Sequence, residues 1–335
     1  MKLCIFSDTH LNVSRQAHTT AESSKKLNDR LYEQATNCLS LEHDNVIVGD
    51  LFDKTFNPEW AIIQGIHIAK QAFVLSGNHD ETNREGTKCS LEVVHASGGQ
   101  VIRQLRIGYP HVKVIGDLVF VPHHATQELF DQALEEAVKM SKELRGNRYL
   151  FVHCNRGEAI GDKSDSTLFI SDEQEDKLLG YFHRIFYGHE HKAATHKGGK
   201  VVVCGNTFPT SFGDIGTKYR YFLDTDSAEL TSEVIWDVDT HYVEVTIGET
   251  LPVAKEAEFV LIKGSATRKE TAEMIEECWK AYPQALAVRS IVSYPEEVVT
   301  KAKASEPVNL LSAIEADLEG SEMLDLFLEL KHAAD

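Results

Sequence analysis

The sequence predicts a layered α/β protein, because short apolar runs alternate with amphipathic stretches over roughly its first 235 residues. The apolar runs are rich in β-branched and aromatic side chains, as buried strands are. They cover residues 3–6, 46–48, 73–75, 118–121, 149–152, 185–187 and 201–204. Helical spacing of apolar residues predicts helices around Leu27/Leu31/Ala35/Cys38, Ile62/Ile63/Ile66/Ala69 and Phe130/Leu134/Ala137. The dipeptide Gly198-Gly199 predicts a hairpin turn.

The pattern changes near residues 236–241, which predicts a second, smaller unit. Strands are expected at residues 242–247, 259–262 and 286–292, with an amphipathic helix over residues 271–279. After Pro307, apolar residues again recur at helical spacing, now on an acidic background. We therefore expect a large domain at residues 1–238, a small α+β domain at 239–300 and a helical tail at 301–335.

The composition is that of a globular protein and limits the classes of function. No run of 18 apolar residues occurs and the apolar start is too short for a signal peptide, so we expect a cytoplasmic protein without a membrane span. The six cysteines are scattered without a CxxC pair, which predicts reduced, buried thiols. The net charge is −18 and no basic stripe stands out, so a nucleic-acid substrate would need basic surface from another protein.

Polar residues with metal-binding chemistry follow five of the predicted strands. They are Asp8 and His10, Asp50, Asn78 with His79 and Asp80, His153, and His189 with His191. The carboxyl ends of parallel strands meet at one edge of a sheet, so residues far apart in the chain can form one site there. Glycines precede Asp50, Asn78 and His189, which suits a sharp exit from a strand.

The candidate ligands combine carboxylates, an amide and imidazoles, without a thiolate. This donor set suits manganese, iron(II) or zinc and does not choose among them. Each motif alone has an ordinary alternative, because Asp-Thr-His is common in turns and caps, and the GNHD and HEH segments could be a loop and a surface stretch. Five such groups, each after a strand, favour a metal centre.

Together, SDTH, GDLFD, GNHD, the His153 strand and GHEH resemble the calcineurin-like metallophosphoesterase superfamily. The resemblance implies a four-layer sandwich of two mixed sheets flanked by helices. It also implies a centre with two metal ions, for which Mn²⁺ is the first choice and Mg²⁺, Fe²⁺ or Zn²⁺ are alternatives. By this resemblance Asp50 bridges two ions, His79 protonates the leaving oxygen, and Asp80 orients His79. The other ligands would be Asp8, His10 and His191 for one ion and Asn78, His153 and His189 for the other.

Within the superfamily, the chain departs from the protein Ser/Thr phosphatases, because Lys54 stands where they carry an arginine and GNHD replaces GNHE. Over residues 1–225 it more closely resembles the nuclease subunit of the SbcCD type and its phage recombination-endonuclease relatives. The resemblance rests on SDTHLN, on the spacing from GDLFD to GNHD, and on GNTFPTSFGD near the end of this region. Asn12, Asn206 and Asp214 differ from the residues usual in that family.

This resemblance implies a homodimeric DNA exo- or endonuclease of recombination and repair, in a bacterial cell or a phage-infected host. The small domain would contact DNA, and the tail would dock on an SMC-like ABC ATPase of the SbcC type. The tail helices packing on their own domain is the alternative for that segment. A stand-alone phosphodiesterase acting on small nucleotides is the second hypothesis for the whole chain, and a degenerate, inactive scaffold is the third.

Several further residues have two interpretations each. His123 and His124 fit a structural loop at the edge of the site or a substrate-facing position. Asp53 fits a partner of a metal ligand or a helix cap. Basic residues after strand ends could contact phosphate, although solvated surface is the simpler interpretation; they are Lys54, Arg84 and Arg156.

Overall fold

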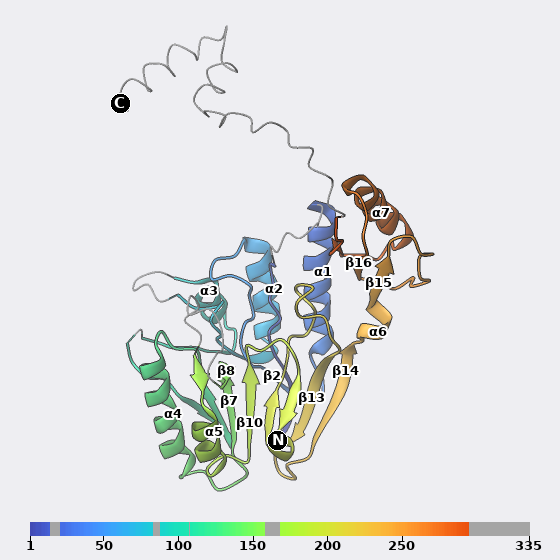
Figure 1. Ribbon diagram of the computed structural model, residues 1–335. Coiled ribbons are helices and arrows are strands. Elements are labelled where there is room, and N and C mark those ends of the chain that lie inside the picture. Colours follow the sequence, from blue (N-terminus) through green and yellow to red (C-terminus); the bar gives the residue numbers. More distant parts are fainter. Residues whose placement is uncertain (14–20, 83–87, 107, 158–167, 295–335) are drawn as a thin grey trace, which may run out of the picture.

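The computed structural model describes residues 1–13, 21–82, 88–106, 108–157 and 168–294, and the expected tail and Arg84 lie outside them. Figure 1 shows two large sheets with helices on their outer faces and a smaller unit beside α1 (Ala21–Cys38). This is the α/β sandwich of two mixed sheets flanked by helices that the sequence resemblance implies.

Among the described residues, the first sheet has six strands, of which β1, β2, β3 and β4 run parallel and the β13–β14 hairpin pairs antiparallel to β1. Its spatial order is β14 (Leu230–Trp236), β13 (Lys218–Asp224), β1 (Lys2–Phe6), β2 (Asp44–Ile47), β3 (Ala72–Leu75) and β4 (Val101–Ile102). Its outer face is covered by α1, α2 (Glu59–Ala69) and α3 (Ser90–Ala96).

In the part of the chain that the structure describes, the second sheet also has six strands, with a parallel centre and an antiparallel strand at each edge. Its spatial order is β11 (Ala194–His196), β12 (Val201–Val203), β10 (Arg184–Gly188), β7 (Tyr149–His153), β6 (Leu118–Val121) and β5 (Lys113–Ile115). The expected Gly198-Gly199 turn is confirmed, because the 3₁₀ turn η1 (Lys197–Gly199) joins antiparallel β11 and β12.

The alternation of side chains along each strand builds the layers. In β1, Leu3 and Ile5 enter the core between the two sheets, whereas Cys4 and Phe6 point to the helices of the first sheet. Both faces of the central strands are therefore buried, which explains their uninterrupted apolar runs.

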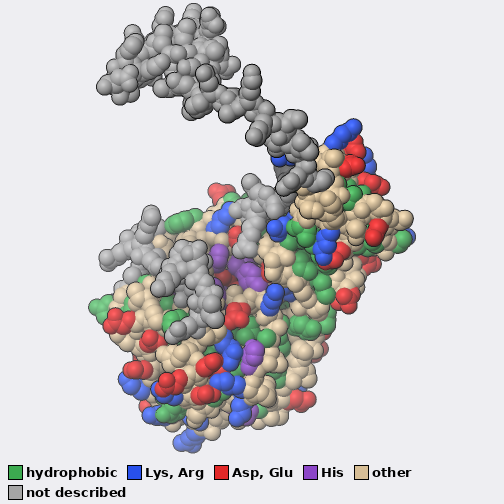
Figure 2. All heavy atoms as spheres, in the orientation of Figure 1, with side chains coloured by type: hydrophobic (Ala, Val, Ile, Leu, Met, Phe, Trp, Pro, Cys, Tyr) green, Lys and Arg blue, Asp and Glu red, His purple; other side chains and the backbone are tan. Residues whose placement is uncertain are grey.

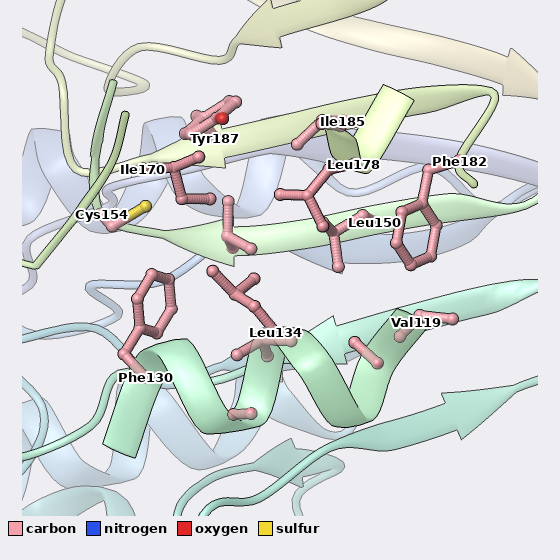
Figure 3. Close-up of a cluster of buried hydrophobic side chains, with 14 of the residues drawn as sticks. Val119, Phe130, Leu134, Leu150, Cys154, Ile170, Leu178, Phe182, Ile185 and Tyr187 are labelled. Atoms are coloured by element: carbon pink, nitrogen blue, oxygen red, sulfur yellow. The ribbon is translucent and has the colours of Figure 1, made fainter. Parts of the chain in front are cut away.

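The helices α4 (Gln127–Ser141) and α5 (Asp172–Leu179) cover the second sheet. Figure 3 shows Phe130 of α4 pointing toward Cys154, and Leu134 of α4 pointing toward the strand that carries Leu150. A short parallel pair, β8 (Asn155–Arg156) and β9 (Phe169–Ile170), leads from β7 toward α5. This packing fixes β7 and β10, the strands from which His153 and His189 emerge.

Residues after β14 form a separate parallel sheet with a helix. The short α6 (Val238–His241) leads into β15 (Tyr242–Thr246), β16 (Phe259–Lys263), α7 (Arg268–Ala281) and β17 (Ala287–Ser290). This unit contacts α1 through a core that includes Leu27, Trp236 and Phe259, and through an ion pair 2.8 Å long between Arg30 and Glu258.

The structure also contains elements that the apolar runs do not predict. The β13–β14 hairpin has half-exposed strands with interspersed charges, so it lacks a continuous apolar run. Helices α3 and α5 are too short for a clear helical repeat. All six cysteines are buried and unpaired, as expected. Within the described part of the chain, no helix has the length and hydropathy needed to cross a membrane.

Candidate metal centre

The candidate ligands meet where the carboxyl ends of strands from both sheets face each other. Asp8, Asp50 and Asn78 follow β1, β2 and β3 of the first sheet. His153 ends β7 and His189 follows β10 of the second sheet. Figure 2 shows histidine side chains gathered near the centre of one face of the molecule. The sequence predicts a site at one edge of a single sheet, whereas in the structure the site lies where the two sheets meet.

The backbone leaves these strands in a conformation that L-residues rarely adopt. Among the described residues, few non-glycine positions have a positive φ, and they include Asp8 at 52°, His10 at 45°, Asp50 at 49° and His189 at 87°. Such geometry costs about 1 kcal/mol or more for each residue. Backbone hydrogen bonds hold it in place, with the N–H of Asp8 donating to Gly49 and that of His10 donating to Asp50, both at 3.1 Å.

The first group of candidate ligands consists of Asp8, His10 and His191. The Nε2 atoms of His10 and His191 lie only 2.9 Å apart, and Asp8 Oδ1 lies 3.7 Å from the former and 4.0 Å from the latter. Asp8 and His10 are fully buried, whereas His191 is partly exposed. The ligand atoms of this group fit one cation.

The second group consists of Asn78, His153 and His189. The Oδ1 of Asn78 lies 3.1 Å from His153 Nε2 and 3.0 Å from His189 Nδ1. Asp50 lies between the groups, because its Oδ2 is 3.3 Å from His153 Nε2 and 3.8 Å from His10 Nε2. The structure therefore brings all seven candidate ligands together, with Asp50 in the central position.

Two of the four histidines are oriented by an oxygen atom that accepts a hydrogen bond behind the ring. The Nδ1 of His153 donates to the carbonyl of Val48 at 2.8 Å, and that of His191 donates to Asp214 at 3.1 Å. With the proton on Nδ1, the Nε2 of each of these two rings can offer its lone pair to a cation. The Nδ1 of His10 lies 3.3 Å from Asp53 but has no hydrogen-bond partner among the described residues.

The position of Asp53 favours a role as partner of a metal ligand over a role as helix cap. Its carboxylate lies against His10, and its backbone carbonyl accepts a hydrogen bond of 2.8 Å from Nδ1 of His79. It thus contacts a candidate ligand and the candidate acid at once.

The expected pairing of Asp80 with His79 does not occur. The Asp80 carboxylate is fully buried and accepts hydrogen bonds from the backbone N–H groups of Leu51, Phe52 and Gly77 at 3.0–3.1 Å. The chain turns after Asn78, which directs Asp80 inward while His79 stays partly exposed. Asp80 therefore joins the loop after β2 to the loop after β3, and the carbonyl of Asp53 orients His79 instead.

The electrostatics of the ligand set show how its charges interact. Burial raises the pKa of Asp50, but His153 and His10 outweigh it and hold that pKa well below its usual range. Burial lowers the pKa of His153, but Asp50 outweighs it and raises that pKa to about 10. Burial and the neighbouring His153 lower the pKa of His189 to about 4. Asp50 and His153 thus stabilise each other's charged forms at the centre of the ligand set.

The remaining candidates have mostly structural environments. The guanidinium of Arg156 is bound by Glu175 at 2.9 Å, which favours a structural role over phosphate binding. His124 is buried, with Nδ1 donating to the carbonyl of Pro122 at 2.7 Å. His123 is also buried beside the centre, and burial together with His153 lowers its pKa to about 3. Lys54 is exposed.

Fold and ligand geometry together define a metal-dependent hydrolase of the α/β sandwich class. A family model for calcineurin-like phosphoesterases matches residues 1–193, and the chain belongs to this family. No curated protein matches the chain.

Two similar solved structures share little sequence with this chain. A putative 5'-nucleotidase from Staphylococcus aureus, solved in complex with alpha-ketoglutarate, is 15% identical with a TM-score of 0.40, over 70% of this chain and 52% of that one. Calcineurin-like phosphoesterase YfkN from Bacillus subtilis is 12% identical with a TM-score of 0.37, over 70% and 90%. This chain thus spans about half the length of the first of these proteins.

Proposed function

We propose that this chain is a dinuclear phosphodiesterase that cleaves DNA as the nuclease subunit of a complex with an SMC-like ABC ATPase. The observation that carries the two-metal reaction is the position of Asp50, which faces one histidine of each ligand group at 3.3 and 3.8 Å. One cation would be held by Asp8, His10 and His191, and the other by Asn78, His153 and His189. Mn²⁺ is our first choice, with Mg²⁺, Fe²⁺ and Zn²⁺ as alternatives.

When bound, such cations neutralise the phosphate and lower the pKa of an attacking water. His79 would donate a proton from Nε2 to the leaving oxygen as the P–O bond breaks. Its Nδ1–H is held by the carbonyl of Asp53, so the ring presents Nε2 in a fixed orientation. Burial lowers the pKa of His79, but Asp50 and the backbone carbonyl of Asp53 outweigh it and raise that pKa above its usual value.

DNA as the substrate is supported by the resemblance over residues 1–225 and by Lys54 in place of the phosphatase arginine. The unit at residues 239–300 is the proposed DNA contact, and the tail at 301–335 is the proposed docking segment for the ATPase. A net charge of −18 fits a subunit that relies on its partner for basic surface. We expect this subunit to act as a homodimer.

The second candidate is a stand-alone phosphodiesterase for small nucleotides. The same net charge favours it, because a small substrate held by two cations needs no basic surface on the protein.

One experiment separates the two candidates. The purified chain is incubated with Mn²⁺ and end-labelled duplex DNA, with and without an SMC-like ABC ATPase of the SbcC type, next to a His79→Ala variant. Cleavage of DNA that requires Mn²⁺ and His79 supports the nuclease. Intact DNA alongside efficient hydrolysis of a cyclic nucleotide or bis(p-nitrophenyl) phosphate supports the small-nucleotide enzyme and overturns the nuclease proposal.

A further inference from the structure

We propose that Asp214 and Lys218 are positioning residues for His191, and that they set the affinity of the cation site formed by Asp8, His10 and His191. This inference rests on the metal centre proposed above. It assigns a role to two residues in or beyond the loop after β12, far in sequence from most of the ligands.

The contact between Asp214 and His191 fixes both the tautomer and the direction of the ring. Asp214 Oδ2 lies 3.1 Å from His191 Nδ1, and a carboxylate can only accept there, so the proton resides on Nδ1. The opposite atom, Nε2, then directs its lone pair toward His10 Nε2, 2.9 Å away. A carboxylate behind a metal-binding histidine raises the basicity of the ligand and restricts its rotation.

The Asp214 carboxylate is itself held in place by donors of its own loop. Its Oδ2 accepts hydrogen bonds from Nδ2 of Asn206 at 2.6 Å and from the N–H and hydroxyl of Thr210 at 3.0 Å. Its Oδ1 accepts from the N–H and hydroxyl of Ser211 at 2.8 and 3.0 Å. With the carboxylate fixed on both oxygens, the position of His191 is set by the loop and does not depend on a mobile side chain.

Lys218 joins the same two residues through their backbones. Its buried ammonium group donates to the carbonyl of Asp214 at 2.6 Å and to that of His191 at 3.2 Å. Burying a charged lysine costs free energy unless its ammonium group is hydrogen-bonded or paired. Here the ammonium group of Lys218 connects the loop to the segment that carries His191, so both ends of the Asp214–His191 contact are held at a fixed separation.

The test is the binding of Mn²⁺ to metal-free protein, measured by titration calorimetry. We expect two sites in the wild-type chain, and for Asp214→Asn a loss of about 10- to 100-fold in affinity at one site only. Asp214→Glu, which keeps the carboxylate, should recover part of that loss. Lys218→Met should also weaken one site only. Glu258→Gln is the matched control, because this buried carboxylate binds Trp236 and Arg30 away from the centre.

The thermal midpoint of each metal-free variant shows whether that variant folds. Unchanged affinity at both sites in Asp214→Asn, or an equal loss at both, overturns the inference, whatever happens to the midpoint. If Asp214→Asn does not fold, Thr210→Val removes one hydroxyl donor to the same carboxylate, and it should weaken the same single site by a few-fold. A wild-type chain that binds no Mn²⁺ would instead contradict the proposed metal centre itself.

Discussion

Gly188 lies directly against the imidazole of His153. A Cβ added to Gly188 would lie 2.7 Å from Nδ1 of His153 and 1.8 Å from the carbonyl oxygen of Val48, which is the acceptor of that Nδ1. The glycine before His189 therefore makes room for a different ligand, which emerges from the neighbouring strand β7. The same ring also excludes a side chain at Gly49, where a Cβ would lie 1.9 Å from His153 Nδ1.

Gly188→Ala is expected to displace His153 and to destabilise the fold by about 3 kcal/mol, because the clash involves backbone as well as the ring. Mn²⁺ binding should weaken in the same variant, since His153 can no longer keep its bond to Val48. Denaturant unfolding and calorimetric titration measure the two effects. Gly216→Ala serves as the control, because a Cβ there meets nothing within 4 Å. Equal behaviour of the two variants would refute the packing argument.

Asp80→Asn tests the structural role that replaces the expected pairing with His79. An amide offers one oxygen, so its NH₂ group must face at least one of the N–H donors of Leu51, Phe52 and Gly77. We expect a loss of stability of about 1–3 kcal/mol in denaturant unfolding. If Asp80 instead orients His79, stability would be unchanged and the pH dependence of kcat would shift.

His79→Ala should slow the chemistry without removing metal. For diphenyl phosphate, whose phenolate leaving group needs protonation, we expect kcat to fall by roughly 10²- to 10⁴-fold. For bis(p-nitrophenyl) phosphate the loss should be much smaller, because p-nitrophenolate is a better leaving group. The metal content of both proteins is measured by elemental analysis in parallel. A variant that loses metal together with activity would show that His79 acts as a ligand.

The ligand residues could be predicted from sequence because each follows a strong apolar strand at short range. Asp50 lies two residues after the run at residues 46–48, and His153 directly follows the run at 149–152. The arrangement of the strands in two sheets came only from family resemblance, since strands buried on both faces carry no periodic signal. Residues that act behind the ligands were harder to find. Lys218 lies in β13, whose half-exposed pattern predicts no strand, and Asp80 lies beside His79 in sequence but points inward.

Glu175 should make stability depend on pH in the acid range. Its buried carboxylate accepts from Arg156 at 2.9 Å and from the hydroxyl of Tyr187 at 3.1 Å, and it pairs with Lys197 at 2.9 Å. Burial raises the pKa of Glu175, but Arg156 and Lys197 outweigh it, so the folded-state pKa lies below its usual range. The stabilisation is therefore complete above the unfolded-state pKa, roughly 4.3, and is lost as pH falls through the folded-state value.

Glu175→Gln should thus lower the free energy of unfolding by about 2 kcal/mol at pH 7, and the difference from wild type should shrink in acid. Denaturant unfolding of the metal-free protein between pH 7 and pH 3, in the presence of a chelator, measures this difference. Glu173→Gln is the control on the same helix, because Glu173 is exposed and its pairing with Lys177 contributes little. A difference between Glu175→Gln and wild type that stays constant with pH would mean that the charge of Glu175 does not stabilise the fold. The loss at pH 7 would then come from packing and hydrogen-bond geometry alone.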